Sequence, residues 1–313
     1  MLAGPFQFAV EKVGEVKIGI SCGWLENYWG DWFTAKQYGG SEHIAIEVAA
    51  ALAAQGHQVT VRLPYERAEM VHRGVRWLAL SAPPEHFDLL FCMDDHQRRD
   101  SGDRTALVVC RSDPPPTTDF DQMIFLSKHH ASLLGHSGRP AVGGGVDTSA
   151  YRSSLRRDRG HVICTSSPDR CRAAFDILPF FSKHTFTYKP VAGLPVTKQV
   201  SREELVVLQK KAQVLIYPLD PVRPSDFFSM AVLESLAAGT PVVVSDADSM
   251  TELWSDVATV IPRPINVREW VGQIDNLIGN KPLWMKYSLL GKALADRYDW
   301  THVARRYVEA ALS

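Results

Sequence analysis

Short apolar runs recur along the chain, and polar connections rich in glycine or proline separate them. The runs Val16 to Ser21, Val214 to Leu219 and Val242 to Val244 show little of the alternation between apolar and polar residues that marks a half-exposed strand. A strand without alternation is buried on both faces, as in a parallel sheet that helices cover on both sides. The pattern therefore predicts an α/β fold with parallel sheets.

The first half of the chain contains a unit of strand, helix and strand. A strand over Val16 to Ser21 leads through an aromatic loop to Gly39-Gly40-Ser41-Glu42, and a helix over His43 to Gln55 and a strand over Gln58 to Leu63 follow. Glycines directly before a helix let an anion approach the free backbone N–H groups of its first turn. Further short strands are expected over residues 74–80, 87–93, 106–110 and 122–126.

In the second half, Ala212 to Glu252 has the pattern of strand, loop, helix and strand. The helix, from about Phe228 to Ala238, is apolar almost all round but contains Glu234, and a buried carboxylate costs free energy unless it is hydrogen-bonded. Asp226 lies eight residues earlier, near the helix start, where free N–H groups favour an anion. Helical rise over all eight residues would separate the two acids by roughly 12 Å, a spacing that suits a nucleotide sugar.

Each of these acids also has a purely structural interpretation. Asp226, or equally Ser225, is a residue type that helices prefer at the N-cap. Glu234 can instead pair with an arginine inside the protein, although nearly every neighbour in the segment is apolar. The sequence alone leaves both alternatives open.

Composition narrows the class of protein. The 313 residues suffice for two domains of ordinary size, and 45% apolar and 22% charged residues are typical of a soluble globular protein. A formal net charge of −1 provides no overall basic field for nucleic acid or an anionic membrane. Five cysteines without C-x-x-C spacing indicate buried thiols, and neither a signal-peptide pattern nor an apolar run of membrane length is found. We therefore expect a cytoplasmic protein whose contact with membranes is at most peripheral.

The segment from Asp226 to Asp246 resembles the donor-binding signature of family 4 glycosyltransferases, which are retaining enzymes with the GT-B fold. In that signature two acids separated by seven residues precede a small-residue helix end and a G-T-P-V-V strand, as Asp226, Glu234 and the run from Gly239 do here. The resemblance implies that Asp226 contacts the hydroxyls of the donor sugar and that Glu234 holds the ribose. The other donor-binding residues that it implies are Phe228, Ser229, Met230 and Ala231, with the backbone of the last three on the diphosphate.

Motifs in the first half extend this resemblance. Gly39 and Gly40, with Leu52 to Val59 downstream, match the family's G-G-x-E loop and L-x-x-x-G-H-x-V motif, which implies that the two glycines face the donor diphosphate across a cleft. Family members often have a His-Asp pair on the acceptor side of the reaction. Here Ser112 stands at the His position and only Asp113 matches.

The second half is expected to supply the positive charge for the diphosphate. Relatives place an Arg and, five residues later, a Lys after a strand; Arg170 matches the Lys, whereas Thr165 stands at the Arg position. Arg170 would therefore carry most of the neutralising charge. Glu252 matches the acid of a G-G-x-x-E motif in which Asp248-Ser249 replaces the glycines. Asp246-Ala247-Asp248 looks like a D-x-D metal motif, but we interpret it as structural.

The resemblance covers nearly the whole chain and implies an α/β fold with two Rossmann-like domains that face a cleft. The expected parts are an acceptor-side domain over residues 1–150, a nucleotide-sugar-binding domain over residues 151–296, and a C-terminal helix over residues 297–313 that crosses back to the first domain.

The implied reaction moves a hexose from a nucleotide diphosphate sugar to a hydroxyl of a glycan, lipid-linked or small-molecule acceptor. It proceeds with retention, and we expect no metal, no other cofactor and no nucleic-acid partner. Asp226, Arg170 and Asp113 are the expected catalytic residues. The departures at Thr165, Ser112 and Asp226 keep open a catalytically impaired subunit that binds nucleotide sugars, and a GT-B sugar-nucleotide epimerase is a further alternative.

Overall fold

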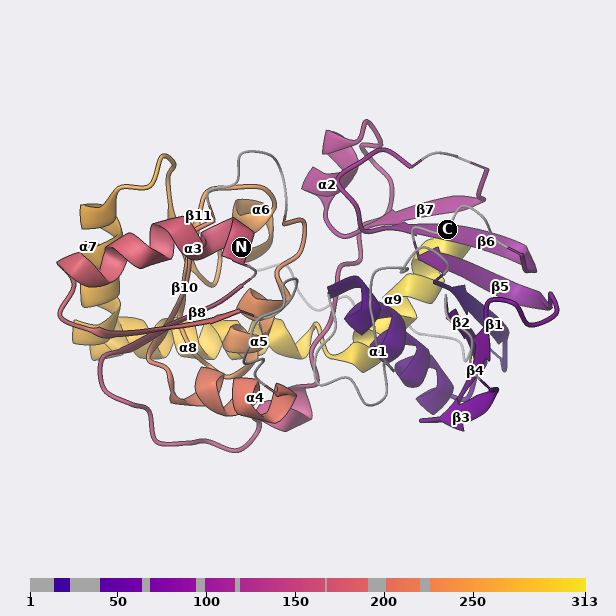
Figure 1. Ribbon diagram of the computed structural model, residues 1–313, viewed down its shortest axis with the longest axis horizontal. Helices are drawn as coiled ribbons and strands as arrows, with labels where there is room; N and C mark the ends of the chain where they lie inside the picture. Colours follow the sequence, from indigo (N-terminus) through magenta and orange to yellow (C-terminus); the bar gives the residue numbers. More distant parts are fainter. Residues whose placement is uncertain are drawn as a thin grey trace, which may run out of the picture.

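The computed structural model describes residues 14–22, 40–63, 68–93, 99–115, 119–166, 168–190, 201–219 and 226–313. Within these ranges the chain forms two sheets, each in a lobe of its own, and Figure 1 shows the lobes side by side. The first lobe holds a seven-stranded sheet in the order β3-β4-β2-β1-β5-β6-β7, and the second holds a five-stranded sheet in the order β12-β11-β10-β8-β9. Gly39 and the aromatic loop before it lie outside the described residues.

The bounds of the elements are as follows. The strands are β1 (Lys17–Ser21), β2 (Gln58–Leu63), β3 (Met70–His72), β4 (Val75–Ala79), β5 (His86–Met93), β6 (Ser101–Val109), β7 (Gln122–Phe125), β8 (His161–Ser166), β9 (Thr185–Pro190), β10 (Val214–Tyr217), β11 (Val242–Ser245) and β12 (Thr259–Ile261). The helices are α1 (Gly40–Ala54), α2 (Lys128–Leu133), α3 (Pro168–Ile177), α4 (Arg202–Lys211), α5 (Met230–Ala237), α6 (Met250–Trp254), α7 (Val267–Gly279), α8 (Lys281–Asp296) and α9 (Trp300–Leu312), with short 3₁₀ turns η1 (Thr148–Tyr151) and η2 (Leu178–Phe181).

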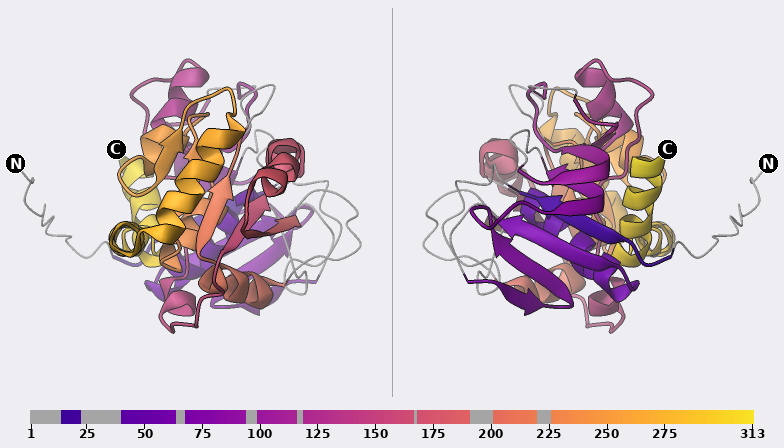
Figure 2. Two further views of the ribbon diagram at one scale, coloured as in Figure 1. Left: turned by 90° about the vertical axis from the view of Figure 1, so that its left-hand side faces the viewer. Right: turned by 90° about the vertical axis from the view of Figure 1, so that its right-hand side faces the viewer.

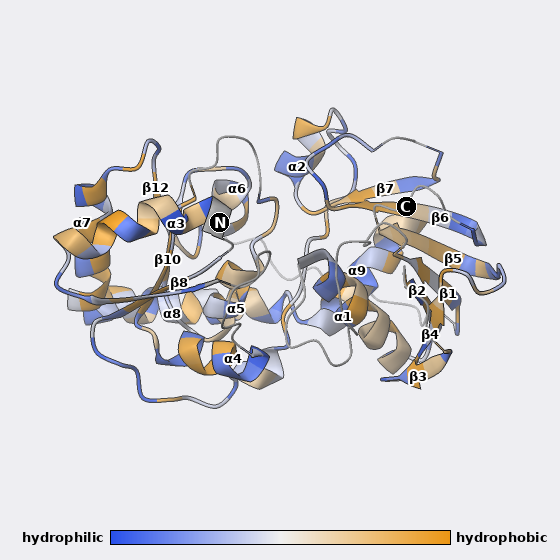
Figure 3. Ribbon diagram, in the orientation of Figure 1, coloured by the Kyte–Doolittle hydropathy of each residue, from blue (hydrophilic) through white to orange (hydrophobic). Residues whose placement is uncertain are grey.

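The strands pair as the apolar runs predict. Every described pairing is parallel except that of β3 with β4, and β1 lies between β2 and β5, with Ile18 opposite both Val59 and Leu89. The centres of β6 and β7 are apolar, whereas the end of β6 that lies away from the second lobe is polar (Figure 3). The predicted α/β fold with parallel sheets is therefore confirmed.

Helices bury the apolar faces of both sheets. In the second lobe α5 packs on α8, and in the first lobe α1 packs on α9. The last helix, α9, also contacts β6 and β7, and Figures 1 and 2 show it beside the first sheet although it follows the second lobe in the chain. The residue limits expected for the two domains stay predictions.

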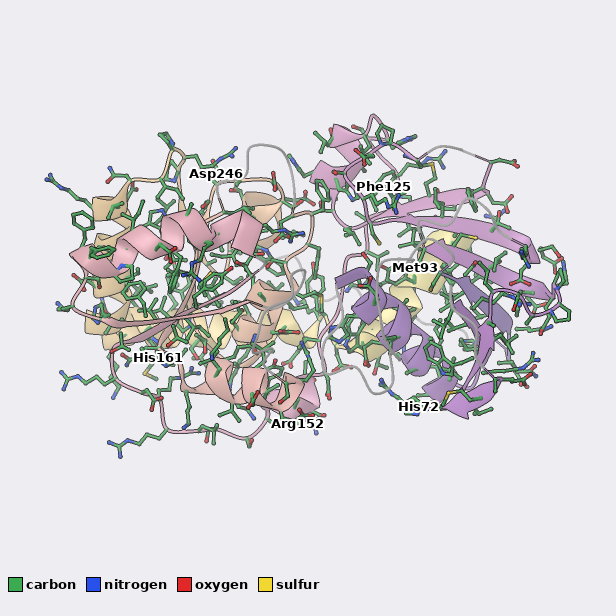
Figure 4. The ribbon with its side chains drawn as sticks, in the orientation of Figure 1. His72, Met93, Phe125, Arg152, His161 and Asp246 are labelled. Carbon is green, nitrogen blue, oxygen red and sulfur yellow. The ribbon has the colours of Figure 1, made fainter. Side chains whose placement is uncertain are left out.

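The carboxyl ends of the first sheet face the second lobe. Figure 4 shows Met93, at the end of β5, and Phe125, at the end of β7, on this side. The chain crosses between the lobes through glycines 143–145, which pack tightly. A Cβ atom on Gly145 would come 2.6 Å from the Trp300 ring, and the Gly143 carbonyl accepts a hydrogen bond from the Tyr307 hydroxyl at 2.9 Å. Side chains larger than hydrogen would push the crossing away from the helices that it contacts.

A second group of contacts joins the lobes next to this crossing. The hydroxyls of Ser127 and Ser249 lie 2.6 Å apart, and the carboxylate of Glu252 accepts hydrogen bonds from the first two backbone N–H groups of α2 at 2.9 and 2.6 Å. The imidazole of His130 stacks on the ring of Phe227 with centroids 4.0 Å apart. The two lobes therefore meet through polar and aromatic contacts that involve the loop before α5 and the start of α6.

The cysteines agree with the expectation of buried thiols. All five lie in the described part of the chain and form no disulfide, and four of them are buried. Within the described ranges, none of the helices combines the length and the apolar character needed to cross a membrane.

Candidate active site

Asp226 lies in the connection between β10 and α5 and is 3% exposed. Its carboxylate accepts hydrogen bonds from the Tyr217 hydroxyl at 2.5 Å and from Nη1 of Arg170 at 3.2 Å, and its backbone N–H donates to Asp248 at 3.0 Å. Burial raises the pKa of Asp226, while the positive charge of Arg170 and the hydrogen bond from Tyr217 oppose the rise. The carboxylate is thus held in one orientation by partners from three other segments.

Arg170 lies in the first turn of α3, and its side chain is 35% exposed. A cation at the start of a helix opposes the helix dipole and so favours a nearby anion. The ion pair with Asp226 supplies one, and the partly exposed side chain can contact a second. The structure therefore brings together two of the three predicted catalytic residues.

Helix α5 begins at Met230, and Ser229 is its N-cap because the Ser229 hydroxyl accepts a hydrogen bond from the backbone N–H of Val232 at 3.4 Å. The alternative that Asp226 caps this helix is wrong, since the helix starts four residues beyond it. Ser225 lies outside the described residues. The backbone N–H groups of Met230 and Ala231 have no acceptor in the helix and can bind an anion.

The start of α1 lies opposite the start of α5. Helix α1 begins at Gly40, and a Cβ atom built there would lie 4.0 Å from Cγ of Met230. Phe228, a further predicted donor-site residue, is buried against the glycine crossing between the lobes. Two helix N-termini, each of positive potential, therefore meet at the junction of the lobes (Figure 1).

Glu234 is 2% exposed and has two protein partners. Nη1 of Arg202 donates to one of its oxygens at 2.7 Å, and Nε2 of Gln209 donates to the other at 3.1 Å. The alternative of an internal arginine partner is thus present in the structure. It does not exclude a ligand, because an ionised carboxylate has about four lone-pair sites. The assignment of Glu234 to the ribose stays a prediction.

Three further positions singled out in the sequence make no described hydrogen bond or ion pair with Asp226 or Arg170. Asp113 and Ser112 are exposed in the loop after β6, and no described contact joins Asp113 to Asp226 or Arg170. Thr165, at the end of β8, is fully buried, and its hydroxyl has no hydrogen-bond partner among the described atoms. An uncharged, buried Thr165 cannot take the place of the arginine that relatives have.

Sequence reasoning missed four residues that hold the acids, namely Tyr217, Asp248, Arg202 and Gln209. Tyr217 is the last residue of an apolar strand, and its position at a carboxyl end was a usable signal. Asp248 has φ = 48°, the left-handed region that favours glycine, and it occupies a glycine position of the resembled motif. Gln209 follows Arg202 by seven residues, a spacing that puts both on one face of α4.

A hollow of about 390 Å³ lies apart from these residues, beside α1 and the start of α9. It contains none of the predicted donor-site or catalytic residues. Its lining is formed by Glu47, Ala50, Ala51, Ala54, Arg73, Asp147, Asp299, Trp300 and Thr301.

Part of the chain matches known glycosyltransferase sequences. Residues 187–291 match the model of a family described as glycosyl transferases group 1, and this range contains β10, α5 and β11. A stretch of 109 residues, 34% of this chain, is 26% identical to the D-inositol 3-phosphate glycosyltransferase of Nocardia farcinica. The match spans 23% of the length of that curated relative.

Solved structures resemble the chain over nearly its whole length. The glycosyltransferase AviGT4, involved in avilamycin A biosynthesis, has a TM-score of 0.71 at 14% identity and covers 95% of this chain and 97% of its own. Sucrose-phosphate synthase from Thermosynechococcus elongatus has a TM-score of 0.68 at 13% identity, and the match covers 93% of this chain and 97% of the synthase structure. Anabaena HepE, solved with UDP-glucose, has a TM-score of 0.67 at 13% identity, and the match covers 94% of this chain and 99% of the HepE structure. The chain therefore has the GT-B fold of these glycosyltransferase structures.

Proposed function

We propose that the chain transfers a hexose from a nucleoside diphosphate sugar to an acceptor hydroxyl, with retention at the anomeric carbon and without a metal ion. The observation that carries the proposal is the placement of the Arg170–Asp226 pair next to the start of α5, where α5 meets the start of α1. A cation and two sets of free backbone N–H groups suit a diphosphate. The similarity to a structure solved with UDP-glucose supports this class of donor.

The reaction needs stabilisation of the leaving diphosphate, on which negative charge develops as the glycosidic bond breaks. Donors that are already in place when charge develops are the most effective, because nothing has to reorganise. The N-termini of α1 and α5 are fixed by their own helices. Arg170 is paired with Asp226, and its side chain is partly exposed, so it could also contact a phosphate oxygen.

Each end of the donor is assigned to one buried acid. Asp226, fixed by Tyr217 and Arg170, would accept hydrogen bonds from hexose hydroxyls. Glu234, one helical turn inside α5, would accept hydrogen bonds from the ribose. Both acids have lone pairs beyond those that the protein uses.

The proton balance requires no protein nucleophile. The acceptor hydroxyl attacks the anomeric carbon from the face that the diphosphate leaves and gives its proton to the departing phosphate oxygen. Asp113 is assigned to the acceptor side of the reaction as an acid. Asp246 accepts a hydrogen bond from Thr251 at 2.5 Å and Asp248 accepts one from the backbone of Asp226, which supports a structural role for the D-x-D sequence.

The acceptor and the location of the protein are proposals carried over from the sequence. A glycan, a lipid-linked compound and a small molecule all present the hydroxyl that the reaction needs. We propose a cytoplasmic protein with at most peripheral membrane contact, in keeping with the expectation of buried thiols and their burial in the structure.

A thermal-shift panel of UDP, GDP, ADP and dTDP with their common sugars tests the donor site, with Glu234→Gln as the variant. We expect one nucleotide to stabilise the parent and to lose most of this effect in Glu234→Gln. Glu203→Gln, on the exposed first turn of α4, is the matched control and should behave as the parent.

Transfer is then measured with the stabilising nucleotide sugar and a mixture of acceptors. Equal stabilisation of parent and Glu234→Gln would refute the ribose assignment. Binding without any product would favour the nucleotide-sugar-binding subunit, and nucleotide release without an acceptor would favour the epimerase.

A further inference from the structure

A chain of three hydrogen bonds runs through the interior of the second lobe to Glu234. The Tyr151 hydroxyl donates to Oε1 of Gln209 at 2.7 Å, Nε2 of Gln209 donates to Glu234 at 3.1 Å, and Arg202 donates to the other oxygen of Glu234 at 2.7 Å. Tyr151 is 4% exposed, Gln209 is fully buried and Glu234 is 2% exposed. A group that water cannot reach keeps the partners that the protein gives it.

The chemistry of the groups fixes the direction of every hydrogen bond. An ionised carboxylate only accepts, so the Gln209 group that faces Glu234 must be the NH₂. The carbonyl oxygen of the amide then faces Tyr151, whose hydroxyl must donate. Burial, and next the charge of Glu234, raise the pKa of Tyr151 well above its ordinary value, so the hydroxyl keeps the proton that it donates. The network thus has one arrangement.

The backbone around Gln209 is held as firmly as its side chain. Its carbonyl accepts a hydrogen bond from the Thr240 hydroxyl at 2.6 Å. The next residue, Lys210, donates through Nζ to the Ala150 carbonyl at 2.6 Å and to the Ser153 hydroxyl at 2.9 Å. Gln209 therefore approaches Glu234 from a fixed position on the closed side of the lobe.

The other side of Glu234 is more open. The Arg202 side chain is 34% exposed, in contrast to the buried Gln209. The positive charge of Arg202 also contributes, after burial, to lowering the pKa of His43 in α1. A ligand at the junction of the lobes would thus meet Glu234 from the side of Arg202, opposite the Gln209 contact.

We propose that Gln209 and Tyr151 are positioning residues that orient the Glu234 carboxylate toward the two adjacent hydroxyls of a ribose. This inference rests on the proposed function, because it assumes that Glu234 binds the nucleoside of the donor. A rotated carboxylate could accept from one hydroxyl only. The Tyr151–Gln209 pair therefore determines how strongly the site distinguishes a ribonucleotide from its 2′-deoxy form.

The test is isothermal titration of UDP, GDP and ADP and of their 2′-deoxy forms into the full chain. For the nucleotide that binds, we expect the parent to prefer the ribo form by about tenfold or more, the value of one hydrogen bond to a charged group. Gln209→Leu should lose most of this preference. Tyr151→Phe, which keeps the ring and removes the hydroxyl, should lose part of it and guards against a failure of Gln209→Leu to fold.

Gln213→Leu is the matched control, because the Gln213 side chain accepts a hydrogen bond from the backbone of Gly160 at 2.6 Å and contacts no acid in the described structure. It should keep the ribo preference of the parent. If the variants at Gln209 and Tyr151 weaken ribo and deoxy binding equally, their role is structural and the inference is wrong. A parent that binds nucleotides without any ribo preference, or that binds dTDP alone, also overturns the inference while leaving donor binding intact. A parent that binds neither the six compounds nor dTDP overturns the proposed function together with it.

Discussion

Replacing Arg157 by methionine should destabilise the second lobe far more than the same change at Arg156. The two residues are neighbours in one basic connection, yet they have different surroundings. The guanidinium of Arg157 donates to the Ala212 carbonyl at 2.6 Å, to the Thr240 hydroxyl at 2.6 Å and to the Ala238 carbonyl at 2.7 Å. Arg156 is exposed and makes no described hydrogen bond or ion pair.

The magnitude follows from what methionine leaves behind. It keeps an aliphatic stem, but the carbonyls of Ala212 and Ala238, both in buried residues, lose their donor. A buried polar group without a partner costs about 1–3 kcal/mol. The guanidinium also lies 4.9 Å over the ring of Trp284, a contact that contributes about 1 kcal/mol. We therefore expect Arg157→Met to lower the free energy of unfolding by about 3–5 kcal/mol, and Arg156→Met to change it by less than about 0.5 kcal/mol.

Urea denaturation followed by circular dichroism measures both variants against the parent. The charge change is identical in the two, so a general electrostatic effect would lower both midpoints equally. A difference between the variants below about 1 kcal/mol would refute the argument that Arg157 joins the ends of α4 and α5 through hydrogen bonds to buried residues.

Two further predictions concern residues at the lobe junction. Asp226→Asn should abolish most of the transfer activity while raising or preserving the stability of the fold near pH 7. The pKa of Asp226 is raised in the folded protein, so its contribution to stability is present below its ordinary pKa and is lost as pH rises through the folded pKa. Transfer assays and denaturation at pH 4 and 7 check this, and a large loss of stability at pH 7 would contradict it. Burial lowers the pKa of His130 to about 4, so His130 alone should cost the parent about 3 kcal/mol of stability as pH falls from about 6.5 to 4, because the unfolded imidazole gains a proton first. His130→Gln should show a flatter dependence of unfolding free energy on pH over this range, and parallel curves would contradict the assignment.

Local pattern was enough to predict the elements that carry the site. The apolar strand expected at Val214 to Leu219 forms over Val214–Tyr217, and the helix expected from about Phe228 to Ala238 forms over Met230–Ala237. The helix end is fixed by Gly239, whose φ of 67° is one that other residues rarely adopt. Backbone preferences of this kind depend on a few neighbouring residues, and these are visible in the sequence.

The partners of the buried acids could not be predicted in this way. Tyr217 and Arg170 reach Asp226 from the end of a strand and the start of another helix, and Arg202 reaches Glu234 from α4. These contacts depend on how whole elements pack, which periodicity does not determine. The basic connection illustrates the same limit, since nothing in its sequence separates the half-buried Arg157 from the exposed Arg156.

The ion pairs of the buried acids in this molecule are of two kinds, which differ in whether the arginine is buried or partly exposed. Arg62 and Asp100 form a pair in which both side chains are buried, at 1% and 2% exposure, and the remaining Arg62 donors bind backbone carbonyls of the same lobe. A pair enclosed on all sides can only hold the fold together. Asp226 and Glu234 are buried to the same degree, but their arginines are 35% and 34% exposed.

This asymmetry has a physical consequence for binding. Each acid is held in one orientation by a buried partner, and its arginine is still reached by water. When a ligand arrives, the buried partner is already in place and the arginine side chain is able to turn. Both arginines lie in the first turn of a helix, α3 or α4, where a cation is unfavourable without an anion nearby. A diphosphate at the lobe junction would relieve that cost for Arg170. A ribose is neutral and would instead add hydrogen bonds to the Arg202–Glu234 pair, whereas the enclosed Arg62–Asp100 pair has nothing to gain from a ligand.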